Sequence, residues 1–151
     1  MARYVTSVAT PLSPGEALSY MADVTHFADW DPGVKHVRRI AAGGPRGDGP
    51  GVGAVYDLTV KAGGTTVMRY EVTEYEPPRR ILLISRTALL TSVDEISVEA
   101  SGTGSIVTYD AKLTLSGPIG LFDPLLRVAF RRIGDRAAAG LRRVLNGHDV
   151  T

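Results

Sequence analysis

The residue best suited by type and position to carry chemistry is Asp94, a carboxylate on the predicted inward face of a strand. In the predicted strand Leu89–Glu99, alternate residues share a face, which places Ser92 and Asp94 among apolar neighbours. The adjacent predicted strands add large side chains to the same face, namely Tyr56, Met68, Tyr70 and Tyr109. A carboxylate left unpaired in such surroundings would raise its pKa or draw in water or a cation. Asp94 is therefore the first candidate for a functional group.

Three roles for Asp94 are open at the level of the sequence. The carboxylate could form a structural pair with a tyrosine, with Arg69 or with Arg86. It could instead anchor a ligand hydroxyl, or act as a general acid or base. For the acid–base alternative, Tyr70 and His36 are the accompanying catalytic candidates.

Trp30, the only tryptophan, ends the second of two short predicted helices. Its indole either fills the core between these helices and the strands or lies at a cavity mouth, where it would stack on an aromatic guest. The two interpretations are compatible. His26 and His36 lie on either side of this region without the spacing of a metal site, so no metal is expected.

Composition argues against several classes of site and partner. The 151 residues contain no cysteine, which excludes disulfides and thiolate metal centres. The glycine-rich stretch Gly43–Gly53 lacks the Gly-Lys-Ser/Thr of a phosphate loop and opens no helix, so no nucleotide or other cofactor is expected. A formal net charge of +1 gives no reason to expect a nucleic-acid partner. No apolar run reaches the roughly 20 residues of a membrane span, so stable membrane insertion is not expected.

The elements that must position these residues follow from periodicity and caps. Ser13, Pro14 and Glu16 form the capping signature of a helix at Pro14–Ala22, and a second short helix is predicted at Val24–Trp30. Gly43–Gly51 is interpreted as a mobile hairpin loop. The predicted strands are Arg3–Thr10, Val34–Ala42, Val52–Lys61, Thr65–Glu76, Arg80–Arg86, Leu89–Glu99 and a last one containing Val107–Leu115.

A long amphipathic helix is predicted at Ile119–Leu145. Its apolar residues recur at spacings of three and four and include Leu126, Ala129, Phe130 and Ile133. Arginines occupy the other faces and are interpreted as a solvated surface. Gly134 and Gly140 each cost about 1 kcal/mol relative to alanine inside a helix. A helix that retains both is expected to lie very close to a neighbouring element or to leave room for something.

These segments resemble the START-like, helix-grip superfamily, in its polyketide cyclase/dehydrase and lipid transport branch. The resemblance spans essentially the whole chain and rests on Ser13–Leu18, Met21–Val34, Gly51–Gly53, Val72–Arg79 and Gly102–Tyr109. It implies an α+β fold in which a seven-stranded curved antiparallel sheet grips the C-terminal helix over a mostly apolar pocket. We accordingly expect a single ligand-binding domain over residues 1–151, cytoplasmic, and a monomer or homodimer.

The leading hypothesis is a protein that binds or carries a hydrophobic small molecule, lipid-like or aromatic and polyketide-like. The predicted ligand-binding residues are Trp30, Tyr56, Met68, Tyr70, Asp94, Tyr109, Leu126, Ala129, Phe130 and Ile133. Ligand entry is expected to be gated by the Gly43–Gly51 loop and the start of the final helix. The alternative is a cyclase or dehydratase that uses a pocket acid or base, and a third is a protein-interaction module with a filled core. The binding and the enzymatic hypotheses both require a void between the C-terminal helix and the sheet, and the interaction module does not.

Overall fold

The N-terminal elements form as their capping residues predict. The computed structural model describes residues 1–61, 64–116 and 123–149, without the side chains of 123–126 and 148–149. Strand β1 (Ala2–Thr10) leads into helix α1 (Pro14–Ala22), where Ser13 Oγ accepts the backbone N–H of Glu16 and the Glu16 carboxylate accepts that of Ser13. The predicted capping box is therefore confirmed.

The second short helix begins as a 3₁₀ turn. The turn η1 (Val24–His26) runs directly into helix α2 (Phe27–Trp30), and the Asp23 side chain caps it by accepting the backbone N–H of Thr25 at 3.2 Å. These two short segments place Phe27 and Trp30 in the core.

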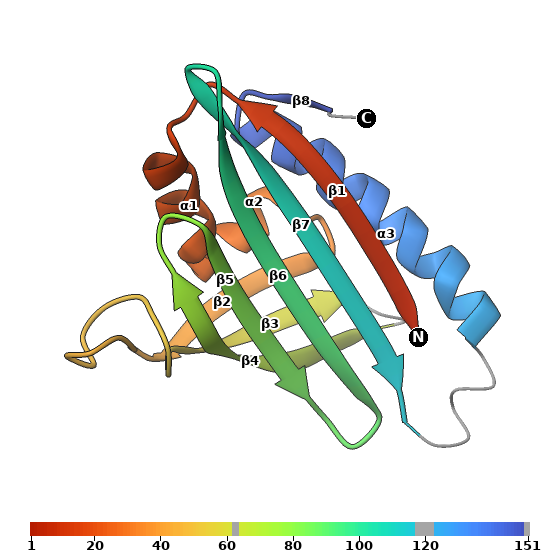
Figure 1. The fold of residues 1–151 in the computed structure, drawn as a ribbon. Helices are drawn as coiled ribbons and strands as arrows, with labels where there is room; N and C mark the ends of the chain where they lie inside the picture. Colours follow the sequence, from red (N-terminus) through yellow and green to blue (C-terminus); the bar gives the residue numbers. More distant parts are fainter. Residues whose placement is uncertain (62–63, 117–122, 150–151) are drawn as a thin grey trace.

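All strands belong to one antiparallel sheet in the order β2-β3-β4-β5-β6-β7-β1-β8 (Figure 1). The bounds are β2 Val34–Ala41, β3 Val55–Lys61, β4 Thr65–Glu76, β5 Arg80–Arg86, β6 Leu90–Ser101, β7 Gly104–Leu115 and β8 His148–Asp149. The seven long strands match the predicted ones. The two-residue β8 pairs with Val8 and Ala9 of β1.

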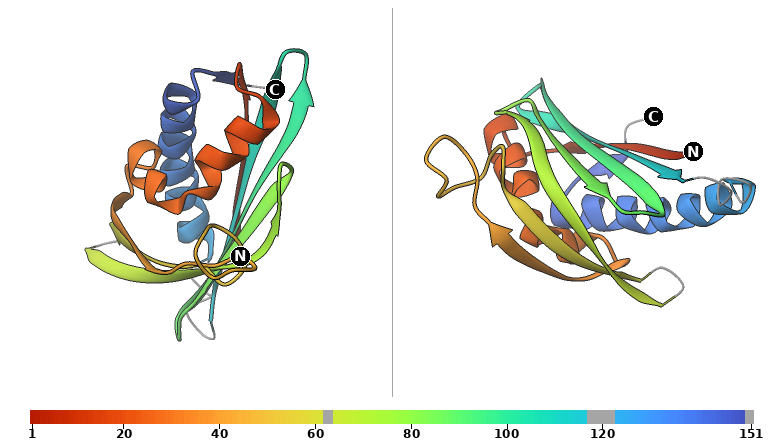
Figure 2. Two further views of the ribbon diagram at one scale, coloured as in Figure 1. Left: turned by 90° about the vertical axis from the view of Figure 1, so that its left-hand side faces the viewer. Right: turned by 90° about the horizontal axis from the view of Figure 1, so that it is seen from below.

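Helix α3 (Asp123–Val144) lies on the concave side of the sheet together with α1 and α2 (Figure 2). It contacts β1 and α2. The predicted helix started at Ile119, and residues 119–122 lie outside the described part of the chain. The curved sheet and its C-terminal helix confirm the expected helix-grip architecture.

The two glycines of α3 mark its closest contacts. A Cβ added at Gly140 would overlap the backbone carbonyl of Trp30, and one added at Gly134 would overlap the ring of Tyr4. The close approach expected from these glycines is therefore confirmed, because α3 lies directly against α2 at one and against β1 at the other.

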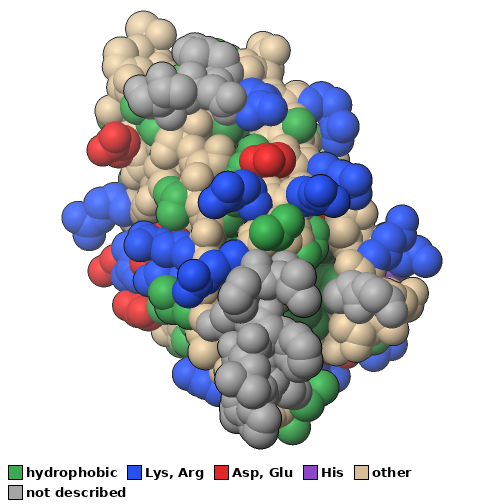
Figure 3. All heavy atoms as spheres, turned by 90° about the vertical axis from the view of Figure 1, so that its right-hand side faces the viewer, with side chains coloured by type: hydrophobic (Ala, Val, Ile, Leu, Met, Phe, Trp, Pro, Cys, Tyr) green, Lys and Arg blue, Asp and Glu red, His purple; other side chains and the backbone are tan. Residues whose placement is uncertain are grey.

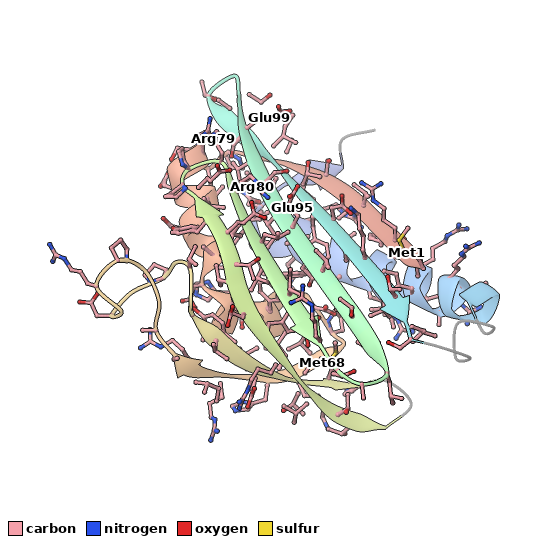
Figure 4. The ribbon with its side chains drawn as sticks, turned by 60° about the horizontal axis from the view of Figure 1, so that its bottom comes forward. Met1, Met68, Arg79, Arg80, Glu95 and Glu99 are labelled. Atoms are coloured by element: carbon pink, nitrogen blue, oxygen red, sulfur yellow. The ribbon has the colours of Figure 1, made fainter. Side chains whose placement is uncertain are left out.

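The faces of the sheet and of α3 that point away from the core carry the charge. Arg80 of β5 contacts Glu74, Glu76 and Glu95 at 2.9–3.0 Å, and Arg80 and Glu95 lie side by side in Figure 4. Lys and Arg side chains also gather on the side of the molecule that Figure 3 presents. The α3 arginines that are exposed are Arg127, Arg131, Arg132, Arg136 and Arg143. No helix among the described residues is long and apolar enough to cross a membrane.

Candidate ligand-binding cavity

A cavity of about 150 Å³ lies between α3 and the concave face of the sheet. Its wall is mostly apolar and comes from both layers, with Phe130 and Ile133 on α3, Leu58 on β3 and Met68 on β4. Met68 is labelled in Figure 4. The polar lining includes a group of hydroxyl and carboxyl side chains on the sheet. The fold therefore leaves a void where the helix-grip arrangement predicts one.

The polar group is a chain of hydrogen bonds that ends at Asp94. Tyr70 Oη donates to Ser92 Oγ at 2.9 Å, and Ser92 Oγ donates to Asp94 Oδ1 at 3.3 Å. From the other side, Tyr109 Oη donates to Asp94 Oδ2 at 2.7 Å. Both oxygens of the buried carboxylate are thus satisfied by hydroxyl groups.

Strand register explains how residues from three strands meet. Asp94 of β6 lies opposite Ala111 of β7, and Tyr109 is the next residue of β7 on the same face, in the diagonal position from which a long side chain can reach. Tyr70 of β4 crosses the intervening strand β5 to reach Ser92. The small side chain of Ala111 leaves space beside the carboxylate.

Burial sets the ionisation of this group. It raises the pKa of Asp94 to about 6, against the hydrogen bonds from Tyr109 and Ser92, which favour the carboxylate. Burial also raises the pKa of Tyr70 and of Tyr109 well above 10, and the negative charge of Asp94 adds to both effects. The tyrosines therefore remain neutral donors, and Asp94 is the group that titrates near neutral pH.

A second carboxylate, Asp31, lines the same cavity. It directly follows α2, and its Oδ1 accepts the backbone N–H of Gly33 at 2.9 Å, which orders the turn into β2. Burial raises the pKa of Asp31, and its charge contributes to the raised pKa of Asp94. The cavity thus holds two electrostatically coupled carboxyl groups.

The hydrogen bonds of Asp94 show which of its predicted structural pairings forms. Arg69 forms a two-point ion pair with Asp57 at 2.7 and 2.9 Å, and Arg86 is exposed at the end of β5. Asp94 is bonded to a tyrosine, which was one of the predicted structural pairings. Because the same carboxylate lines the cavity, this pairing does not remove it as a ligand anchor.

Comparison with known sequences gives the family. A sequence model described as polyketide cyclase/dehydrase and lipid transport matches residues 1–146. The chain belongs to this family. No functionally curated protein sequence matches the chain.

Solved structures support the same fold for this member of the polyketide cyclase/dehydrase and lipid transport family. A START superfamily protein from Mycobacterium smegmatis aligns over 97% of this chain and 98% of its own, with a TM-score of 0.77 and 15% identity. The di-domain ARO/CYC StfQ from the steffimycin biosynthetic pathway aligns over 95% of this chain and 49% of its own (TM-score 0.70, 13% identity). Major latex-like protein 151 from Panax ginseng aligns over 89% and 97% (TM-score 0.56, 13% identity). At these identities the likeness shows the fold alone.

Six of the predicted site residues line the cavity between α3 and the sheet. They are Met68, Tyr70, Asp94, Tyr109, Phe130 and Ile133. Strand alternation and helical periodicity selected them because both patterns report which face is turned inward. Their role in binding stays a prediction.

Other predicted site residues lie elsewhere. Trp30 is 1% exposed and does not line the cavity, since α3 packs on its backbone, so it is a core residue rather than one at the cavity mouth. Tyr56 is buried and faces a separate hollow on the side of α1. Ala129 and His36 are exposed and do not line the cavity, and the side chain of Leu126 lies outside the described residues. The Gly43–Gly51 loop contributes no lining residue either.

Sequence reasoning missed Tyr4, Phe27, Asp31 and Lys61 as cavity residues. Tyr4 lies on the first strand and was treated only as part of its alternation. Asp31 precedes Pro32-Gly33, a turn sequence, and its carboxylate accepts the backbone N–H of Gly33 in that turn. The sequence feature that bears on Asp31 is its position between Trp30 and Val34, two apolar residues that the fold buries.

The side chains that line the cavity allow few kinds of chemistry. Within the described ranges, no group of three or more His, Asp or Glu side chains is placed to hold a metal ion. Burial raises the pKa of the lining carboxyl group of Asp94 to about 6. The cavity can therefore enclose an apolar body, accept hydrogen bonds from it and exchange a proton at one carboxylate.

Proposed function

We propose that the protein binds a small, mostly apolar molecule in the cavity between α3 and the sheet. The observation that carries this proposal is the combination of a void of about 150 Å³ with apolar walls and one buried hydrogen-bonding group. An apolar cavity of about this volume accommodates benzene. The guest that fits without movement of α3 is thus a single aromatic ring or a chain of similar size.

A larger lipid-like or polyketide-like guest would need more room. Of the α3 side chains that line the void, Phe130 and Ile133 are half-buried or exposed, whereas Ala137 is buried, as is Leu141 further along the helix. The helix is therefore anchored more firmly at its C-terminal half. Displacement of its N-terminal half is the least costly way to enlarge the cavity.

Filling the void is expected to abolish binding of a single-ring guest. Ala111 is 4% exposed and lines the cavity beside Asp94, so Ala111→Leu places three additional carbons in the space a ligand would occupy. Toluene titrated into the labelled protein should shift amide resonances of cavity residues in the wild type, and its affinity should fall more than tenfold in Ala111→Leu.

The matched control is Ala100→Leu, the same substitution at an exposed position of β6. Its toluene affinity should equal that of the wild type. If toluene binds Ala111→Leu as well as it binds Ala100→Leu, or if the wild type binds neither toluene nor a longer apolar probe such as oleate, the proposed cavity function is wrong.

A dehydratase is the second candidate, and the pKa of Asp94 favours it. A general base is most effective when its pKa lies near the working pH, and the value of about 6 meets that condition. The Asp94 carboxylate would take the proton from the carbon next to a ketone, and the carboxylic acid so formed would return that proton to the β-hydroxyl, which leaves as water as the carbon–carbon double bond forms. Of the three sequence-based catalytic candidates, Asp94 and Tyr70 line the cavity and His36 does not.

The dehydratase is tested with 4-hydroxybutan-2-one, which is small enough for the void and gives but-3-en-2-one with strong ultraviolet absorbance. Catalysis predicts a rate above the buffer background that falls at least tenfold in Asp94→Asn and is unchanged in Asp48→Asn, an exposed loop carboxylate. Absence of any acceleration by the wild type, or equal rates in both variants, removes this candidate and leaves the binding function.

A further inference from the structure

The hydroxyl protons of Tyr70, Ser92 and Tyr109 are all used within the hydrogen-bond chain that ends at Asp94, and the hydroxyl of Tyr4, which also lines the cavity, donates to Asp135. A hydroxyl group has one proton to donate. Tyr70 donates its proton to Ser92, and Ser92 and Tyr109 donate theirs to the two carboxylate oxygens. With Asp94 ionised, this wall presents lone pairs to the cavity and has no proton left to offer a guest.

The second carboxylate of the cavity, that of Asp31, is also a hydrogen-bond acceptor. Asp31, which lines the cavity, accepts the N–H of Gly33 at one oxygen, so its carboxylate keeps further acceptor capacity. The one cationic residue among the described lining residues is Lys61, which is exposed at the end of β3. The interior of the cavity therefore combines acceptors with negative charge.

We propose that the cavity selects guests that donate a hydrogen bond, a protonated amine or a hydroxyl on an apolar single-ring body, over guests that only accept one. This inference rests on the proposed binding function and specifies its ligand class. A guest that offers only a carbonyl oxygen would bury that oxygen against lone pairs, and leaving a buried acceptor without a donor is unfavourable. A donor guest gains a hydrogen bond instead, and an ammonium gains a charge-assisted one.

The preference depends on the protonation of Asp94, because a protonated carboxyl group supplies a donor. The titratable and charged groups around it are Tyr109 on β7, Tyr70 on β4, Tyr4 on β1, Asp31 before β2, and Lys61 on β3, with Asp110 acting from the outer face. The described lining residues of α3 carry no charge. Burial raises the pKa of both carboxyl groups inside the cavity, that of Asp94 to about 6, and both groups lose their negative charge as the pH falls.

Four probes of nearly equal size test the inference: ethylbenzene, benzyl alcohol, benzylamine and benzaldehyde. At pH 8 the wild type should bind benzyl alcohol and benzylamine at least tenfold more tightly than benzaldehyde, as measured by calorimetry. In Asp94→Asn, whose amide can donate, this difference should shrink to less than threefold while ethylbenzene affinity changes by less than twofold. The control Asp48→Asn should retain the wild-type order.

A second variant keeps the inference testable if Asp94→Asn does not fold. Ser92→Ala removes the acceptor of the Tyr70 hydroxyl, whose proton then becomes available to a guest, so benzaldehyde affinity should rise severalfold. If ethylbenzene binds the wild type but benzaldehyde binds as tightly as benzyl alcohol, the donor preference is wrong and the binding function stands. If none of the four probes binds the wild type, the donor preference is wrong, and the binding function itself also fails if oleate does not bind.

Discussion

Replacing Gly140 by alanine is expected to lower the free energy of unfolding by about 3 kcal/mol. The added methyl group would overlap the carbonyl oxygen and carbon of Trp30. These are backbone atoms of α2, and the Trp30 side chain is 1% exposed, so neither helix can move without disturbing the core. Alanine recovers about 1 kcal/mol of helix propensity, which is too little to compensate.

Gly15→Ala is the matched control for this substitution. Gly15 lies in the first turn of α1, and a Cβ added there meets no atom within 4 Å. This variant should be more stable than the wild type by about 0.5 kcal/mol, because alanine restricts the unfolded chain. Urea denaturation followed by circular dichroism compares the two. Similar unfolding free energies for both variants would show that α3 does not lie against α2 as the structure has it.

Periodicity predicted the fold well because burial repeats along every element. Two-residue alternation located the long strands to within a few residues, and the capping residues Ser13 and Glu16 located α1. The glycines of α3 also carried information, since each of them marks a contact with a neighbouring backbone or ring. Each of these signals can be recognised within a single segment of the sequence.

The site was predicted less completely because it depends on how segments meet. Trp30 and Tyr56 are inward-facing as expected, yet the crossing of α3 over α2 and the position of α1 place both of them outside the cavity. Ala129 belongs to the apolar stripe by spacing and is nevertheless exposed. A stripe gives the face of a helix that turns inward, but the helix crossing angle decides which of its residues reach the void.

The hydrogen-bond chain illustrates the same limit. Alternation placed Tyr70, Ser92, Asp94 and Tyr109 on one face, and that was correct. Which hydroxyl donates to which oxygen follows from strand register and from the order β4-β5-β6-β7, neither of which a single segment reveals. The donor preference inferred for the cavity therefore could not be read from the sequence.

Asp94→Asn is expected to change how stability depends on pH. The folded-state pKa of Asp94, about 6, lies above its ordinary value of 3.8. A raised pKa means that the folded state binds the proton more tightly, so this group's stabilising contribution is complete below about pH 4 and is lost as the pH rises through 6. The loss amounts to about 3 kcal/mol by pH 8. Asparagine does not titrate, so the variant should gain stability relative to the wild type by up to this amount between pH 4 and pH 8.

Asp57→Asn provides a control with the opposite sign. The hydrogen bond from Arg69 lowers the pKa of Asp57, so its contribution is present above about pH 4 and is lost as the pH falls further. The difference in unfolding free energy between Asp57→Asn and the wild type should therefore be largest at neutral pH and shrink in acid, whereas that for Asp94→Asn changes mainly between pH 4 and 7. A flat difference for Asp94→Asn across that range would mean that the carboxylate is hydrated, and a hydrated carboxylate would satisfy an acceptor-only guest through its water as readily as a donor guest.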